Sequence, residues 1–230
     1  MPKLLIVEQL NKTYHRHQPD EVTALTDISL QISTGEVVAL IGPSGSGKTT
    51  LLSLLGCMSR PTSGSIQLRD RNVSKLPERF LAQIRRETFG FVFQQYNLLR
   101  DLSVLENVML PLYPSALSLH EIKKAASDVL DRFELDGMLK KKVKQLSGGE
   151  QQRVAIARAL VTNPEIIIAD EPTAHLDSEL SQNLLQILTD LNAEGKTIII
   201  ATHDPCIYQS SLIQRRFNLR HGQIVTDSAP

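Results

Sequence analysis

The sequence lacks several features that mark specialised classes of protein. Its 230 residues include only two cysteines, Cys57 and Cys206, and no tryptophan. Two cysteines cannot form a disulfide framework, so we expect a reducing compartment. No apolar run approaches the roughly 20 residues of a membrane-spanning helix, and the N-terminus turns polar too early for a signal peptide. We therefore expect a cytoplasmic protein, in which any membrane role depends on a partner.

An excess of charge of either sign is also absent. Lysine and arginine total 25, and aspartate and glutamate total 25, so the formal net charge is zero. A nucleic-acid-binding protein usually needs a basic surface, and this balance predicts no nucleic-acid partner. Hydrophobic residues make up 41% of the chain, which suits the core of one α/β domain, with or without an inserted subdomain.

A glycine-rich stretch is the feature around which the chain is organised. Residues 36–41 predict a buried strand and residues 50–55 a helix, and the stretch between them consists of Gly42, Pro43, Ser44, Gly45, Ser46, Gly47, Lys48 and Thr49, followed by Thr50. Glycines let successive backbone amides face one anion, and the helix N-terminus adds its positive end. Lys48 would contact the β and γ phosphates, and the Thr49 hydroxyl would face Mg²⁺. This context favours a nucleoside triphosphate site over an ordinary glycine-rich turn.

Half-buried strands are predicted on both sides of this stretch. Residues 4–7, 24–32 and 65–68 have the pattern of an antiparallel sheet. Tyr14 follows the first of these strands, and its ring is either a sheet residue or a platform that stacks on a base.

A helical insertion is predicted after a buried strand at residues 89–93. Gln94 ends this strand, and its side chain would face the crevice where α/β proteins bind ligands. The pattern is helical from residue 95 to about 162, with a capping box at Ser118 and Glu121. The basic run at 140–144 fits a solvated face better than a binding patch.

A second helix start carries two glycines. Ser147 and Glu150 form a capping box, with Gly148 and Gly149 between them. Each glycine costs about 1 kcal/mol in a helix relative to alanine. The pair makes sense if a ligand approaches this helix end closely, so we predict a second phosphate-facing site at Ser147, Gly148 and Gly149.

Two further strands end in titratable side chains. Residues 166–170 end in Asp170, which would hold Mg²⁺, and Glu171 would follow on a continuing strand and polarise water. The alternative to these catalytic roles is that the two carboxylates cap the N-terminus of the next helix. His203 follows the strand at 197–201 and is either a structural histidine or a sensor of the γ phosphate.

Together these stretches resemble the ATP-binding cassette (ABC) ATPases over nearly the whole chain. Residues 42–49 are similar to the Walker A motif, residues 166–170 to Walker B, and residues 146–153 to the family signature, its most specific motif. The resemblance implies an α/β fold of the P-loop NTPase (RecA-like) type. Such a fold has a parallel-sheet core, an N-terminal antiparallel β subdomain and an inserted helical subdomain.

The resemblance also implies a domain plan and residue roles. Residues 1–230 would form one domain, with 1–94 and 163–230 as the ATP-binding core and 95–162 as the helical subdomain. The implied cofactors are ATP and Mg²⁺. The implied site residues are the catalytic Glu171, His203 and Gln94, the adenine-stacking Tyr14, the nucleotide contacts at 42–50 and 147–149, and the metal ligands Thr49, Gln94 and Asp170. Leu176 and Asp177 match the D-loop, whereas His175 departs from the small residue or asparagine usual there.

Within the family, the loop at 15–21 before residues 22–25, the turn at 60–64 and the stretch 91–94 most resemble the group that contains LolD, MacB and FtsE. This implies a homodimer with composite ATP sites that drives an integral membrane permease from the cytoplasmic face of the inner membrane, with a periplasmic adaptor reached through the permease. The alternative is an FtsE-like ATPase that regulates cell-wall hydrolases without transport. A soluble cassette acting on DNA or ribosomes is disfavoured by the single cassette, the lack of a heptad run and the neutral charge.

Overall fold

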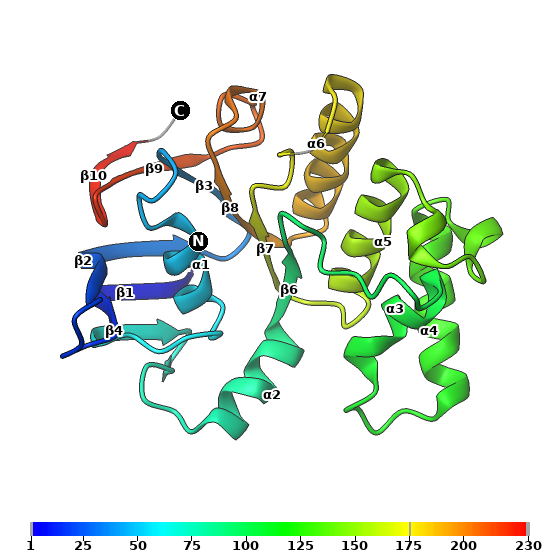
Figure 1. Cartoon of the computed structure of the whole chain (residues 1–230), viewed down its shortest axis with the longest axis horizontal. Helices are drawn as coiled ribbons and strands as arrows, with labels where there is room; N and C mark the ends of the chain where they lie inside the picture. Colours follow the sequence, from blue (N-terminus) through cyan, green and yellow to red (C-terminus); the bar gives the residue numbers. More distant parts are fainter. Residues whose placement is uncertain (1, 175, 229–230) are drawn as a thin grey trace.

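A central parallel sheet separates an antiparallel sheet from a group of helices (Figure 1). The structure is a computed structural model that describes residues 2–174 and 176–228. His175, whose effect on the D-loop was in question, lies outside the described residues. No helix within them combines the length and the apolarity needed to cross a bilayer.

The central sheet has the strand order β10-β9-β3-β8-β7-β6. Its members are β3 (Val37–Ile41), β6 (Phe89–Val92), β7 (Ile166–Asp170), β8 (Thr197–Thr202), β9 (Arg215–Arg220) and β10 (Gln223–Ser228). All neighbours pair in parallel except β10, which pairs antiparallel with β9. Strands β9 and β10 form a hairpin, which joins the central sheet through the parallel pairing of β9 with β3.

The second sheet is antiparallel, with the order β2-β1-β4-β5. It comprises β1 (Lys3–Tyr14), β2 (Val22–Ser33), β4 (Ser63–Leu68) and β5 (Arg71–Asn72). The prediction of a first strand at 4–7 was too short, because β1 continues to Tyr14 through several shifts of register against β2. Such irregularities interrupt the period of two by which a strand is recognised.

Helices follow the strands on both sides of the sheet. They are α1 (Lys48–Leu55), α2 (Glu78–Thr88), α3 (Val104–Met109), α4 (Leu119–Arg132), α5 (Gly148–Leu160), α6 (Ser178–Ala193) and α7 (Pro205–Tyr208), with short 3₁₀ turns at Leu110–Leu112, Asp136–Met138 and Val143–Gln145. Helices α3, α4 and α5 lie together beyond β6 (Figure 1). The predicted capping box at Ser118 and Glu121 is confirmed at the start of α4.

Two hydrophobic cores lie on opposite faces of the central sheet. In β3, Val37 and Ala39 belong to the core shared with the helical group, whereas Val38 and Leu40 belong to the core shared with the antiparallel sheet. Strands β7 and β8 alternate in the same way. Because parallel strands covered on both faces are apolar throughout, these strands appear in the sequence as short unbroken apolar runs.

Candidate functional site

The loop between β3 and α1 requires its glycines for close contacts. Gly47 adopts a φ of 104° immediately before α1. A Cβ atom on Gly47 would lie 2.9 Å from the Ala24 carbonyl oxygen, and one on Gly42 would lie 2.4 Å from the Leu219 carbonyl oxygen. The loop is therefore held between β2 and the end of β9, with α1 beginning at Lys48 as an anion site requires.

Lys48 and Glu171 form an ion pair at this loop. The Lys48 Nζ atom lies 3.2 Å from Glu171 Oε1 and also donates to the Gly42 carbonyl oxygen at 2.7 Å. The other carboxylate oxygen of Glu171 lies 3.0 Å from His203 Nδ1. The structure thus brings the predicted lysine, glutamate and histidine together in one contiguous set of polar contacts.

The backbone at Glu171 differs from our expectation. We predicted that the strand would continue through this residue, but β7 ends at Asp170 and Glu171 has a φ of 45°. Its amide nevertheless donates to the Ala201 carbonyl oxygen at 2.8 Å. The left-handed conformation, rare outside glycine, turns the side chain toward Lys48 and His203 rather than along the strand.

Asp170 has the environment of a metal ligand. Its Oδ1 atom is buried without a hydrogen-bond partner. Burial raises the pKa of Asp170, and a hydrogen bond with the Thr49 side chain opposes that rise. The described residues contain no group of three or more His, Cys, Asp and Glu side chains that could hold a metal ion by themselves. The available donors are oxygen atoms of Thr49, Gln94 and Asp170, which suit a hard cation that takes its other ligands from phosphates and water.

A cleft of about 700 Å³ collects most of the predicted residues. Its lining includes Pro43, Ser44, Gly45, Ser46, Gly47, Lys48, Thr49, Thr50, Gln94, Glu171 and His203. It also includes Val22, Thr23, Ala24, His221 and Gly222, which the sequence analysis missed. The last two lie in the β9–β10 turn, which no local motif connects with the glycine-rich loop.

The other predicted site residues, Gly42, Asp170, Tyr14 and the stretch Ser147–Gly149, lie outside this lining. Tyr14 stands at the end of β1, with its hydroxyl 3.5 Å from Thr50 Oγ1 and the Lys12 ammonium 4.8 Å from its ring centre. Base stacking by Tyr14 therefore stays a prediction. The stretch Ser147–Gly149 begins α5 and does not line the cleft.

The start of α5 combines a confirmed cap with a packing constraint. The Ser147 hydroxyl accepts from the Glu150 amide, and Glu150 Oε2 accepts from the Ser147 amide at 2.6 Å. The hydrogen bonds that the Glu150 carboxylate accepts from the Ser147 amide and hydroxyl lower the pKa of Glu150. A Cβ on Gly149 would lie 2.8 Å from Leu180, whereas one on Gly148 would meet nothing within 4 Å. Packing against Leu180 thus explains why residue 149 is a glycine. Of the two glycines, only Gly148 faces open space at the helix end.

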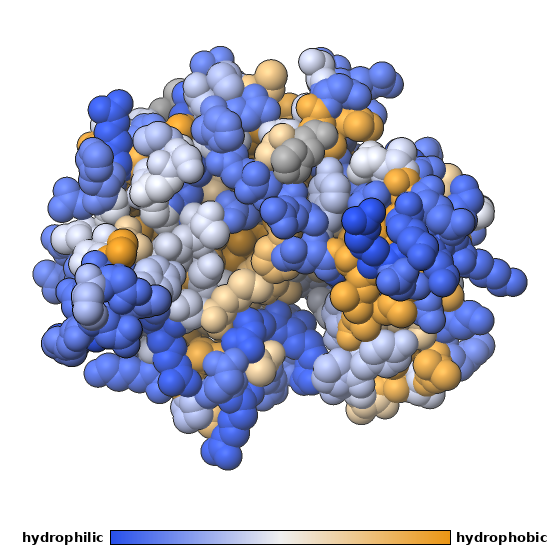
Figure 2. Space-filling view, in the orientation of Figure 1, coloured by the Kyte–Doolittle hydropathy of each residue, from blue (hydrophilic) through white to orange (hydrophobic). Residues whose placement is uncertain are grey.

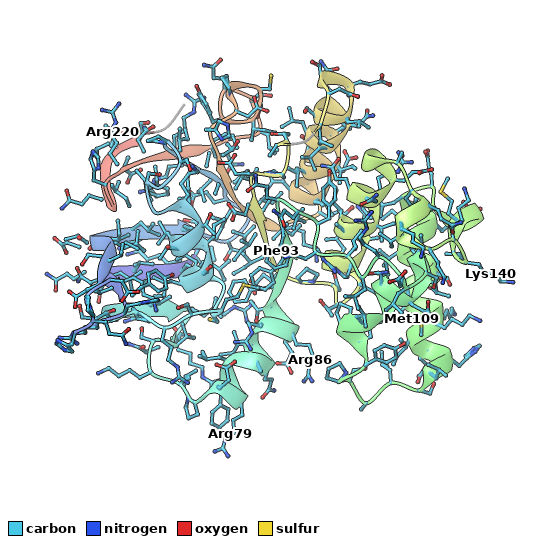
Figure 3. All side chains as sticks on the ribbon, viewed as in Figure 1. Arg79, Arg86, Phe93, Met109, Lys140 and Arg220 are labelled. Carbon is cyan, nitrogen blue, oxygen red and sulfur yellow. The ribbon has the colours of Figure 1, made fainter. Side chains whose placement is uncertain are left out.

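A separate apolar groove of about 710 Å³ lies beside Gln94. Phe89, Phe91, Phe93 and Met58 line it together with Arg79, Arg85, Arg86 and Arg158, and its lining contains no acidic residue. Figure 2 shows this face hollowed between the two halves of the molecule, with hydrophobic residues in the hollow. Figure 3 places Phe93 near the centre, with Arg86 and Arg79 below it on α2.

Comparisons with known proteins agree with this geometry. Residues 25–174 match the family described as ABC transporter. The chain is 47% identical over 227 residues to the macrolide export ATP-binding/permease protein MacB of Hyphomonas neptunium, which covers 99% of this chain and 35% of the relative. It is 46% identical over 207 residues to MacB of Pectobacterium atrosepticum, which covers 90% of this chain and 32% of the relative. The chain thus spans about a third of the length of these curated relatives.

A solved structure extends the match to the whole described fold. The ATP-binding cassette MJ0796, solved as a dimer in a post-hydrolysis state bound to ADP and Pi, superposes with a TM-score of 0.88 at 41% identity and covers 98% of both chains. The parallel core, the antiparallel sheet and the helical group therefore form an ATP-binding cassette. The chain belongs to the ABC transporter family, as an ATP-hydrolysing nucleotide-binding cassette.

Proposed function

We propose that this cassette works as a homodimer that drives an integral membrane permease of the export or mechanotransmission type, from the cytoplasmic face of the membrane. The observation that carries the proposal is the set of contacts among Lys48, Glu171 and His203 beside the phosphate loop. Both curated relatives are named as macrolide export proteins, which favours export over the FtsE-like alternative. A periplasmic adaptor, reached through the permease, belongs to the same proposal.

Each residue of the site has its own role in ATP hydrolysis. Lys48 and the loop amides hold the β and γ phosphates, and Glu171 accepts a hydrogen bond from the attacking water. His203 orients the Glu171 carboxylate, which it contacts at 3.0 Å. Thr49, Gln94 and Asp170 would hold Mg²⁺, which neutralises charge on the phosphates when it is bound.

The second phosphate-facing helix end requires a second chain in this proposal. Ser147 and Gly148 lie outside the cleft of their own chain, and Gly148 leaves open space for an approaching group. In a two-fold dimer each α5 N-terminus faces the nucleotide held by the partner's phosphate loop, giving two equivalent composite sites.

The groove beside Gln94 is the surface that we assign to the membrane partner. A short helix with an apolar face and an acidic residue fits its phenylalanine side chains and Arg79, which forms no ion pair with the described residues. The sequence allows two interpretations of the apolar residues Tyr96, Leu98 and Leu99 that follow Gln94, namely contact with a membrane partner or packing within the helical insertion. Leu98 packs against the helical core and none of the three lines the groove, so contact of these residues with the partner stays a prediction.

Two measurements test the proposed function. Specific ATPase activity of the wild-type cassette should rise with protein concentration and then saturate, because each active site needs two chains. In a Cys206→Ser background, Gln83→Cys in the groove should crosslink to a co-purified membrane subunit, and Asp70→Cys on the antiparallel sheet should not. Activity per chain that is independent of concentration would contradict the dimer, and equal crosslinking from both positions would contradict the assignment of the groove.

A further inference from the structure

The loop that follows Gln94 has an unusual backbone. Tyr96 and Asn97 are consecutive non-glycine residues with φ values of 57° and 49°. This region is sterically unfavourable for L-residues, especially for a bulky side chain such as tyrosine. Despite this backbone, the two carbonyl oxygens lie close enough together to accept hydrogen bonds from one side chain, that of Arg158.

Arg158 binds both of these carbonyl groups. Its Nη1 atom donates to the Asn97 carbonyl oxygen and its Nη2 atom to the Tyr96 carbonyl oxygen, each at 2.6 Å. A planar guanidinium can donate two such bonds at once, whereas an ammonium cannot reproduce this fork. Among the described residues Arg158 forms no salt bridge with a carboxylate, and burial lowers its pKa. The hydrogen bonds to the two carbonyl oxygens therefore offset most of the free-energy cost of removing the guanidinium from water.

Arg158 belongs to α5, the helix whose other end carries Ser147 and Gly148. Near the C-terminus of α5, a Cβ on Gly90 of β6 would lie 2.4 Å from the Ala159 carbonyl oxygen, so the helix sits directly on the strand that leads to Gln94. Near its N-terminus, Gln152 donates to the Pro172 carbonyl oxygen at 3.1 Å, just after Glu171. Helix α5 is thus bonded to the segments that follow both β6 and β7.

We propose that Arg158 is a positioning residue that couples the Gln94 loop to α5, so that a displacement of this loop also moves the Ser147–Gly148 end of the helix. This inference uses one part of the proposed function, namely that Gln94 responds to the bound nucleotide and moves with it. Arg158 also lines the groove, so a partner seated there contacts the same guanidinium. One side chain thereby connects the nucleotide cleft, the groove and the exposed helix end.

The test is hydrogen exchange of the backbone amides at 94–99 and 147–151, with and without a non-hydrolysable ATP analogue, at a concentration where the cassette is monomeric. In the wild type both segments should change exchange rate together. In Arg158→Lys the 94–99 segment should still respond and the 147–151 segment should not. We expect kcat to fall about ten-fold or more, as for other small misplacements of a reacting group, with analogue affinity within about two-fold. Arg60→Lys, which removes a guanidinium that donates to the Leu76 carbonyl, is the matched control.

A second pair of variants tests the same bond from the loop side. Asn97→Pro cannot adopt a positive φ, so it should separate the two carbonyl groups and reproduce the Arg158→Lys phenotype. Asn97→Gly favours a positive φ and should retain the wild-type exchange response. A response at 147–151 in Asn97→Pro or Arg158→Lys equal to that of the wild type would overturn the proposal, as would a wild type without that response. Lack of ATP hydrolysis by the wild type would contradict the proposed function alone, because the exchange measurement does not depend on turnover.

Discussion

The Nζ atom of Lys48 lies 3.2 Å from Oε1 of Glu171, and both side chains are largely buried. The phosphates of a nucleotide and the carboxylate of Glu171 therefore compete for one ammonium group. Attraction between opposite charges is strong where water is scarce, so this competition is part of the free energy of nucleotide binding.

Glu171→Gln should tighten nucleotide binding several-fold and lower kcat by about 100-fold or more, the usual loss for a general base. Lys48→Ala should weaken binding by about 10- to 100-fold, equivalent to one charged hydrogen bond of roughly 1.5–3 kcal/mol. Equilibrium binding and phosphate release measure both effects. Glu165→Gln, which loses an ion pair with Arg69 outside the cleft, is the control. Near-normal turnover in Glu171→Gln would show that Glu171 is not the general base.

Ser147→Arg should bind ATP normally but neither dimerise nor hydrolyse it, because the side chain would occupy the helix end that faces the partner. Ser118→Arg is the matched control, since Ser118 makes the same capping box at the start of α4. Each variant loses a cap worth about 1 kcal/mol, so equal losses of stability are expected. Light scattering of Ser147→Arg and Ser118→Arg, each in a Glu171→Gln background with ATP, measures whether each variant dimerises. A normal dimer in Ser147→Arg would rule out the composite site.

His221→Asn should weaken nucleotide binding by a few-fold without lowering the melting temperature. His221 lines the cleft at a φ of 47°, and the next amide, that of Gly222, donates to the Ser46 carbonyl oxygen at 3.1 Å. Asparagine tolerates a positive φ, so the turn should be kept while the imidazole is lost. His17→Asn, an exposed histidine at a φ of 66°, is the control. Equal nucleotide affinities of His221→Asn and His17→Asn would exclude a contact between His221 and the nucleotide.

Cys57 should make the stability of the cassette fall as the pH rises from 9 toward 11. Burial raises the pKa of its thiol from 9.0 to about 11. Above pH 9 the unfolded chain loses this proton and the folded chain keeps it, so the unfolded state binds fewer protons and unfolding becomes easier. Each unit of pKa difference corresponds to about 1.4 kcal/mol. Urea denaturation of the wild type and Cys57→Ala across this range measures the effect, and parallel pH profiles would contradict it.

Local motifs account for what the sequence predicted well. The phosphate loop, the two capping boxes and the buried strands each depend on neighbouring residues, so spacing and residue type were sufficient to find them. Asp170 and His203 follow the same logic, because parallel strands end at one edge of a sheet.

Contacts between distant segments account for what was missed. The left-handed φ of Glu171 and the packing of Gly149 against Leu180 depend on tertiary neighbours that no local pattern reveals. The same holds for His221, which reaches the cleft only because β9 pairs with β3. The fork between Arg158 and the Gln94 loop joins positions about 60 residues apart.

The parallel pairing of β9 with β3 also has a consequence for biosynthesis. The phosphate loop is synthesised before β9 and β10, yet the Ser46 carbonyl oxygen receives its hydrogen bond from Gly222, and Leu219 closes the space beside Gly42. These partners leave the ribosome more than 170 residues after the loop itself. A nascent chain therefore carries every residue of the glycine-rich stretch while more than 170 further residues are made, without the backbone partners that shape it. The cassette acquires its nucleotide-binding geometry only when the last hairpin has emerged.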